Sequence, residues 1–129
     1  MRQVIYISTG ANVRMDEVEA ILDSSRRNNP AAGITGFLLY NGRNFLQLLE
    51  GREDDLLALL AMLRADERHA GIVLLSDEFI SQRDCPEWTM QHLRLSDSPD
   101  ERRARIEADL PPSLGSMARQ IVANFASLN

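Results

Sequence analysis

The dipeptide Asn41-Gly42 is the feature that most restricts the fold of this chain. It lies between two apolar runs, residues 34–40 and 44–50. Asn-Gly tolerates the positive φ angles of a type I′ turn, which connects two antiparallel strands. We therefore predict a β-hairpin with strands at residues 34–40 and 44–50.

A polar residue interrupts the second strand of this hairpin. Phe45, Gln47 and Leu49 alternate with Leu46 and Leu48, so the first three point to one face of the strand. A buried primary amide without partners costs about 2 kcal/mol or more. Gln47 is therefore either held by routine hydrogen bonds or placed to meet a flat polar ligand.

The hydrophobic periodicity of the remaining chain predicts an α+β fold around the hairpin. Pro30 is expected to end the first helix by pushing Asn29 out of the α region. The acidic residues 53–55 are interpreted as charges at the N-terminus of a second helix. The predicted elements are a strand at 4–9, a helix from residue 15, strands at 34–40 and 44–50, a helix from residue 53 or 54, a strand at 72–75 with an extension toward residue 80, and a strand at 88–95.

This β-α-β-β-α-β-β order predicts a ferredoxin-like sandwich, with two helices on one face of a mixed five-stranded sheet. The polar residues 96–99 then separate a core, residues 1–95, from a C-terminal helical segment, residues 96–129. Two helices are predicted there, the first at 101–109. The second carries an apolar stripe, composed of Leu114, Met117, Ile121, Phe125 and Leu128. We expect the stripe to cover the free face of the sheet, and a partner protein is the alternative.

Composition excludes several classes of function. The net charge of −5 argues against a nucleic-acid surface, which needs a basic patch. A single cysteine, Cys85, rules out an internal disulfide and a cysteine-based zinc site. All 14 basic residues are arginine, so lysine Schiff-base chemistry is excluded. The chain lacks an apolar run of membrane-spanning length and a signal-peptide pattern at its start, and we expect a cytoplasmic protein without membrane association.

Several polar residues lie on otherwise apolar elements, among them Tyr6, Ser25, Asn29, Gln47 and His69. Taken singly, each is better explained as a core, capping or surface residue. Taken together, a phenol and an amide on neighbouring strands would line the floor of an apolar slot between two helices, with amides at its rim. Such a slot suits a flat, redox-active heterocycle.

Five stretches of the chain resemble the BLUF family, blue-light sensors that use FAD. The resemblance covers residues 1 to about 95. The stretches are Ile5-Tyr6-Ile7-Ser8, residues 25–40 (SRRNNPAAGITGFLLY), residues 45–51 (FLQLLEG), Asp66-Glu67-Arg68-His69 and Trp88-Thr89-Met90.

The resemblance implies an FAD cofactor, with FMN or riboflavin as alternatives, and assigns roles by position. Tyr6 would donate an electron and a proton to the excited flavin. Gln47, between Tyr6 and the flavin, would then switch its hydrogen bonds by rotation or tautomerisation, which would shift the absorption to the red. The other residues so assigned are Asn29 at the ring edge, Ser25 and Asn28 in the pocket, Asp66, Arg68 and His69 at the ring and ribityl-phosphate tail, and Trp88 and Met90 in the signal relay.

The resulting expectation is a photoreceptor without enzymatic turnover. Its output would be a changed interaction with a downstream signalling protein, transmitted by the final helix. Self-association as a dimer or larger ring is expected.

Adduct chemistry at Cys85, as in LOV photosensors, is not expected because Cys85 lies at a strand entry, away from the ring. The alternatives are an acylphosphatase-like hydrolase on the same architecture and a light-insensitive interaction module.

Overall fold

The computed structural model describes residues 1–9, 15–65, 70–88, 90–93 and 99–127. The order of the elements confirms the predicted α+β, ferredoxin-like fold with two additional C-terminal helices. The elements are β1 (Arg2–Thr9), α1 (Met15–Ala32), β2 (Thr35–Tyr40), β3 (Asn44–Gly51), α2 (Glu53–Ala65), β4 (Ala70–Phe79), β5 (Gln91–His92), α3 (Pro99–Asp109) and α4 (Ser116–Ser127).

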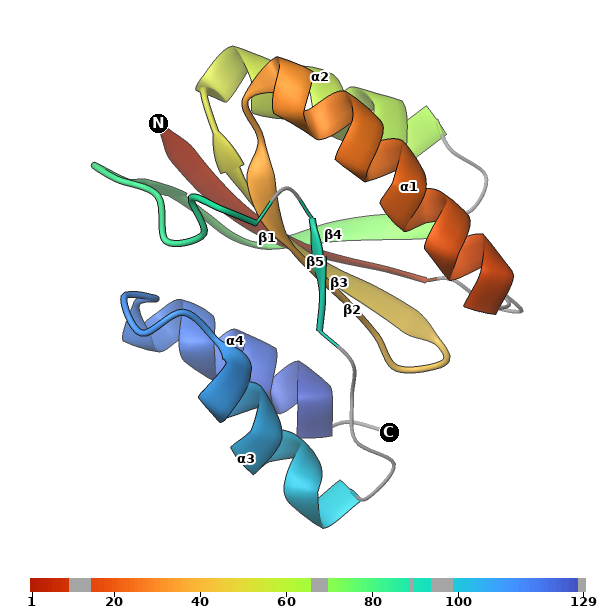
Figure 1. Cartoon of the computed structure of the whole chain (residues 1–129), viewed down its shortest axis with the longest axis vertical. Coiled ribbons are helices and arrows are strands. Elements are labelled where there is room, and N and C mark those ends of the chain that lie inside the picture. Colours follow the sequence, from red (N-terminus) through yellow and green to blue (C-terminus); the bar gives the residue numbers. More distant parts are fainter. Residues whose placement is uncertain (10–14, 66–69, 89, 94–98, 128–129) are drawn as a thin grey trace.

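The strands form one mixed sheet in the order β4-β1-β3-β2-β5. β1 is antiparallel to both β3 and β4, β2 is antiparallel to β3, and β5 adds to β2 in parallel. Helices α1 and α2 cover one face of the sheet, and α3 and α4 cover the other (Figure 1). The predicted boundary between core and helical segment falls at residues 94–98, which lie outside the described residues.

The predicted hairpin is confirmed, but its turn is displaced by one residue. Asn41 pairs with Asn44 through a backbone hydrogen bond of 3.2 Å, so Gly42 and Arg43 occupy the central positions. The Asn41 side-chain oxygen accepts hydrogen bonds from the backbone N–H groups of Arg43 and Asn44. This Asx-type arrangement stabilises the displaced turn, and Gly42 supplies the positive φ of 93°.

The prediction that Pro30 ends the first helix is wrong, because α1 continues to Ala32. Proline lacks only its own N–H, whereas the carbonyls of Asn29 and Pro30 still accept hydrogen bonds from Ile34 and Gly33. These two bonds form a Schellman motif, with Gly33 in the left-handed conformation at φ 68°. The helix therefore ends where glycine permits a left-handed residue.

The last strand is much shorter than predicted. Residues 88–95 were expected to be extended. Residues 89, 94 and 95 lie outside the described part of the chain, and among the others only Gln91 and His92 form β5. Upstream, the Trp88 carbonyl accepts from the backbone N–H of Gly36 and the Met90 carbonyl from the Arg26 side chain. Since these groups are bonded outside a regular ladder, the segment before β5 is irregular. In contrast, β4 confirms the extension toward residue 80, because it runs to Phe79.

A close approach between β2 and β3 requires glycine at position 36. A Cβ atom on Gly36 would lie 1.8 Å from the carbonyl oxygen of Leu48, and the residue has a φ of 156°. Both strands bury residues on both faces of the sheet. Gly36 thus allows β2 and β3, which bury side chains on both faces of the sheet, to pair closely.

The final helices cover the free face of the sheet, as predicted. Their buried side chains pack against the strands in one cluster, formed by Ile5, Phe37, Leu39, Leu46, Leu48, Cys85, Leu93, Ile106, Leu110, Leu114, Val122, Phe125 and Ala126. The prediction is wrong for Met117, which is 63% exposed, and Leu128 of the predicted stripe lies outside the described residues. Met117 lies in the first turn of α4, where the helix face toward the sheet is taken by Ala118, Ile121 and Val122.

No helix in the described part of the chain has both the length and the hydropathy that crossing a membrane requires.

Candidate functional site

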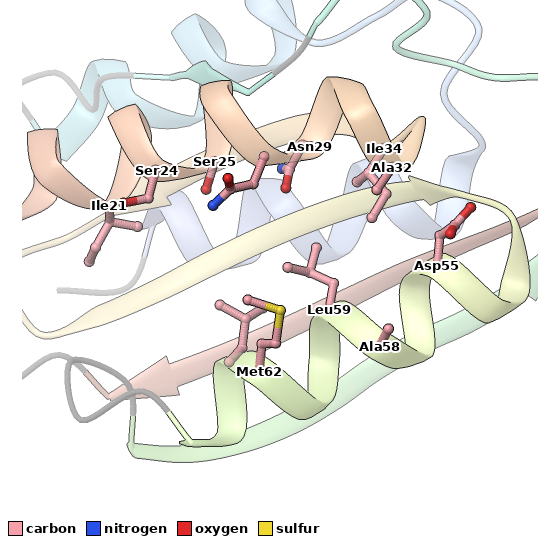
Figure 2. A pocket seen from close by; sticks show the side chains of 12 residues that line it. Ile21, Ser24, Ser25, Asn29, Ala32, Ile34, Asp55, Ala58, Leu59 and Met62 are labelled. Carbon is pink, nitrogen blue, oxygen red and sulfur yellow. The ribbon is translucent and has the colours of Figure 1, made fainter.

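A cavity of about 330 Å³ lies between α1 and α2. The side chains of the two helices point toward one another across it (Figure 2). The lining residues recur at helical spacing, so each helix contributes a single face. They are Ile21, Ser24, Ser25, Asn28, Asn29 and Ala32 on α1, Ile34 after it, and Asp55, Ala58, Leu59, Met62 and Leu63 on α2.

The amide of Asn29 is the polar group of this cavity whose hydrogen bonding is incomplete. Asn29 is only 2% exposed, and its Nδ2 atom has no hydrogen-bond partner in the described part of the chain. An unsatisfied buried donor costs about 1–3 kcal/mol. A ligand with an acceptor oxygen or nitrogen would remove this cost. The apolar walls and this free donor therefore fit a flat heterocycle with ring carbonyls, such as a flavin.

Tyr6 and Gln47 face each other on adjacent strands. They are paired residues in the antiparallel β1–β3 ladder, so their side chains leave the sheet on the same face. The Tyr6 hydroxyl donates to Gln47 Oε1, and both side chains are buried. The strand register, together with the alternation of side chains, is what brings the phenol and the amide together.

The other end of the Gln47 amide contacts Met90. Gln47 Nε2 donates to the Met90 sulfur at 3.2 Å, and both residues are 2% exposed. A thioether is a weak acceptor. The amide therefore has a phenol donor at its oxygen and a weak partner at its nitrogen, so a stronger acceptor near Nε2 could replace the sulfur.

One hydrophobic cluster contains residues of both the Tyr6–Gln47–Met90 group and the cavity wall. Tyr6 and Met90 belong to this cluster together with Ile21 and Ile34, which line the cavity. Leu59, which also lines the cavity, packs against the cluster. The cluster occupies the face of the sheet that α1 and α2 cover. Tyr6, Gln47 and Met90 do not line the cavity themselves, but the cluster connects Tyr6 and Met90 to residues of its walls.

The structure brings together some of the residues predicted for the site and separates others. Ser25, Asn28 and Asn29 line the cavity. Trp88 packs instead on the opposite face, edge-on to Phe37 with ring centroids 5.9 Å apart. Asp66, Arg68 and His69 lie outside the described residues.

Sequence reasoning missed two features near the site. Asp55 was interpreted only as a helix N-terminal charge, yet it lines the cavity. Glu50 was read only as the end of a strand, yet its side chain is fully buried and accepts several hydrogen bonds. The signal that singled out Gln47, a polar residue on an apolar strand, applies equally to Glu50.

The only cysteine lies away from the cavity. Cys85 is buried in the cluster under α3 and α4. Burial raises the pKa of its thiol, and the nearby Glu50 and Asp84 carboxylates raise it further. A protonated thiol on the opposite face is unsuited to adduct formation with a ligand in the cavity.

Comparison with known proteins gives the family of this chain. The family described as sensors of blue-light using FAD, abbreviated BLUF, matches residues 1–91. The chain belongs to the BLUF family. Proteins of this family sense blue light with a flavin, and the recognition made from the five sequence stretches is confirmed.

Relatives of the BLUF chain include a photoactivated cyclase subunit and a light-regulated antirepressor. A photoactivated adenylate cyclase subunit beta from Euglena longa is 34% identical over 95% of this chain and 13% of its own length. The blue light- and temperature-regulated antirepressor BluF of Escherichia coli is 34% identical over 57% of this chain and 19% of its own. The chain spans less than a fifth of the length of the curated relatives it matches.

A solved BLUF structure matches along nearly its whole length. BlrB, a BLUF protein in its dark state, is 29% identical, and the match covers 98% of this chain and 96% of BlrB with a TM-score of 0.75. The ferredoxin-like core and the C-terminal helices thus occur together in a known BLUF protein.

Proposed function

We propose that this BLUF chain is a blue-light photoreceptor in which Tyr6 and Gln47 form the photoactive pair. The observation that carries the proposal is the hydrogen bond from the Tyr6 hydroxyl to Gln47 Oε1, beside a cavity with a free amide donor. Light would change the hydrogen bonds of Gln47 and, through them, the interactions of the protein with a downstream partner.

The residues that would hold the flavin are those of the cavity. Asn29 would donate its free Nδ2 hydrogen to the ring edge, and Ser25 and Asn28 would contribute further polar contacts. The resemblance adds Asp66, Arg68 and His69 to this set. When bound and excited by blue light, a flavin is a strong oxidant of nearby phenols.

The chain's own part in the switch is proton and hydrogen-bond exchange. The Tyr6 phenol carries a proton that points at Gln47 Oε1, so its loss of an electron and that proton would change what the amide oxygen contacts. Within the described residues the amide Nε2 donates to the Met90 sulfur alone, a weak acceptor that it can exchange at small cost. Rotation and tautomerisation of the Gln47 amide are both compatible with these two hydrogen bonds.

Replacing Gln47 tests the switch directly. Gln47→Leu should keep FAD bound but abolish the light-induced red shift, because leucine has no hydrogen bonds to exchange. Absorption spectra before, during and after blue light measure this. Gln120→Leu, at an exposed position on α4, is the matched control and should keep the shift. A normal red shift in Gln47→Leu would remove Gln47 from the mechanism.

Replacing Tyr6 tests the electron donor. Tyr6→Phe should block normal photocycling, since phenylalanine has no labile proton. The chain provides a control in its other tyrosine, Tyr40, which stacks on Phe45 with centroids 4.5 Å apart. Tyr40→Phe should keep the photocycle. An unchanged photocycle in Tyr6→Phe would contradict the assignment.

Output is proposed to pass from a sensor core, residues 1–95, to the C-terminal helical segment, residues 96–129. Support comes from the packing of α4 directly on the sheet through Val122 and Phe125. Hydrogen exchange of α4 backbone amides should therefore differ between dark and lit protein, and identical exchange would contradict this route. No enzymatic turnover is expected of the chain.

A downstream protein partner, a cytoplasmic location and self-association complete the proposal. The names of the cyclase and antirepressor relatives support a signalling role. Sedimentation velocity in darkness and under blue light measures the size of the assembly.

A further inference from the structure

The buried carboxylate of Glu50 gathers donors from three separate parts of the chain. Its side chain is 0% exposed and lies at the end of β3. In the described part of the chain four neutral groups donate to it: Gln3 Nε2 at 3.1 Å and the Asp84 N–H at 3.0 Å to Oε2, and the Thr35 hydroxyl at 3.2 Å and the Cys85 N–H at 2.5 Å to Oε1. Hydrogen bonds to an ionised acceptor are the stronger kind.

Two of these donors are peptide groups of the connection between β4 and β5. Arg83, next to them, donates from Nη1 to the Glu50 carbonyl at 2.9 Å and to the Thr35 hydroxyl at 2.8 Å. Consecutive residues 83–85 are therefore bonded to the ends of β2 and β3. Glu50 is the common acceptor that fastens this connection to the sheet.

The fastened connection leads directly to Met90. The Trp88 N–H donates to the Cys85 carbonyl at 3.2 Å, and the Trp88 carbonyl accepts from Gly36 at 2.8 Å. Cys85 lies in the cluster under α3 and α4, whereas Met90 lies in the cluster under α1 and α2. Between Cys85 and Met90 the chain thus passes from one face of the sheet to the other.

We propose that Glu50 is a positioning residue that places the Met90 sulfur against the Gln47 amide. Glu50 and Gln47 lie on the same strand, and the alternation of side chains sends Glu50 to the face opposite Gln47. One strand therefore carries both the amide and the anchor of the segment that contacts this amide. The inference rests on the proposed function for its effect on the photocycle, while the placement of Met90 can be measured in darkness.

The dark measurement uses the full-length protein with FAD and methyl-labelled methionine. In Glu50→Gln, the side-chain NH₂ faces a peptide N–H, so one of the two peptide hydrogen bonds is lost. The Met90 methyl resonance, assigned from its absence in Met90→Leu, should move by more than its linewidth. The resonance of Met117, exposed on α4, should stay in place. An unmoved Met90 resonance would overturn the proposal.

Glu87→Gln is the matched control. Glu87 is exposed and belongs to the same connection, so the substitution makes the same chemical change without touching the anchor. It should leave the Met90 resonance where it is in the unsubstituted protein. If Glu87→Gln moves the resonance as far as Glu50→Gln, loss of charge alone explains the effect and the proposal fails.

The light measurement is a double-mutant cycle on the rate of dark recovery. Glu50→Gln should change this rate about tenfold, the factor expected for losing a hydrogen bond to a charged group. In the Met90→Leu background Glu50→Gln should produce no further change, because the residue through which it acts is gone. Equal effects in both backgrounds would show that Glu50 acts independently of Met90 and would refute the proposal.

Failure of this proposal is distinguishable from failure of the proposed function. If the unsubstituted protein shows no red shift, the photoreceptor mechanism fails, but the Met90 resonance in Glu50→Gln still decides the positioning role. Should Glu50→Gln not fold, Thr35→Val replaces it, because it removes one donor to the carboxylate and keeps the side-chain shape. A displaced Met90 resonance in Thr35→Val supports the proposal, and an unmoved one overturns it.

Discussion

The two faces of the sheet are built from the same strands but are completed differently. On the face under α3 and α4, side chains such as Phe37, Leu48 and Phe125 form a closed apolar cluster. On the face under α1 and α2, a cavity of about 330 Å³ remains between the helices, and Tyr6 and Gln47 are buried on the same face of the sheet. The centre of the α3/α4 face, the filled face, is thus packed by protein side chains, and a pocket of about 500 Å³ lies at its edge, between residues 79–82 and the start of α4. The α1/α2 face, the open face, keeps a cavity that we propose the flavin occupies.

This difference separates stability from binding within one sheet. Substitutions on the filled face remove contacts that exist in the protein without flavin. Substitutions around the cavity remove contacts that form mainly with a ligand. The two faces should therefore respond independently to substitution.

The largest effect is expected on the filled face. Phe125→Ala should lower the free energy of unfolding by about 3–5 kcal/mol, because it leaves a cavity between α4 and the sheet. Denaturant unfolding of the flavin-free protein measures this. The affinity of the folded variant for FAD should change little.

Leu59→Ala is the corresponding change at the open face. Leu59 is half-buried and already borders the cavity, so its truncation removes few existing contacts. It should cost the flavin-free protein less than about 2 kcal/mol, the lower end of the range for a fully buried leucine. If Leu59→Ala lowered the free energy of unfolding as much as Phe125→Ala does, the α1/α2 face would be as tightly packed as the α3/α4 face, which would contradict the comparison.

An intermediate effect is expected at the free amide of the cavity. Asn29→Ala should weaken FAD binding about tenfold, because it removes a buried hydrogen-bond donor. In the flavin-free protein the amide nitrogen has no partner among the described residues, so Asn29→Ala should lower the free energy of unfolding by no more than about 1 kcal/mol. Fluorescence titration with FAD and denaturant unfolding give both values. Asn28→Ala, at an exposed residue of the same rim, should weaken binding less, and equal losses would argue against the role of Asn29.

The smallest expected effect is a loss of stability at alkaline pH that arises from Cys85, which lies on the filled face. Burial and nearby carboxylates raise the pKa of the Cys85 thiol above its ordinary value of 9.0. Above that value the thiol ionises in the unfolded chain but not in the folded one, so the unfolded state loses protons first and stability falls as pH rises. The loss should be about 0.8 kcal/mol between about pH 8 and pH 9.5.

Cys85→Ala isolates this contribution. The variant should be less stable overall but should lack the thiol's part of the alkaline decline, which pH-dependent unfolding of both proteins measures. Identical pH slopes above pH 9 would show that the Cys85 pKa is not raised by folding.

Parts of the site follow from local sequence rules. The alternation around Gln47 predicted a buried amide, and Gln47 is 2% exposed. The resemblance to the BLUF family assigned Ser25 and Asn29 to the pocket, and both line the cavity. The alternation pattern is reliable because it depends on the geometry of a single strand.

Other parts depended on individual hydrogen bonds between residues two to five positions apart, which the dipeptide preferences do not describe. The turn moved by one residue because the Asn41 side chain bonds Arg43 and Asn44. The first helix continued past Pro30 because Gly33 completes its C-terminal hydrogen bonds. Here side-chain and capping hydrogen bonds overrode the usual dipeptide preferences.

The sequence by itself determined the order of the elements, the face that each strand residue occupies and the family to which the chain belongs. Only the tertiary structure decided that Met90, not Trp88, contacts Gln47, and that Glu50 holds the connection leading to Met90. The reason is physical. Periodicity is a property of one element, whereas the path of an irregular segment between two faces is set by hydrogen bonds to residues far away in the chain.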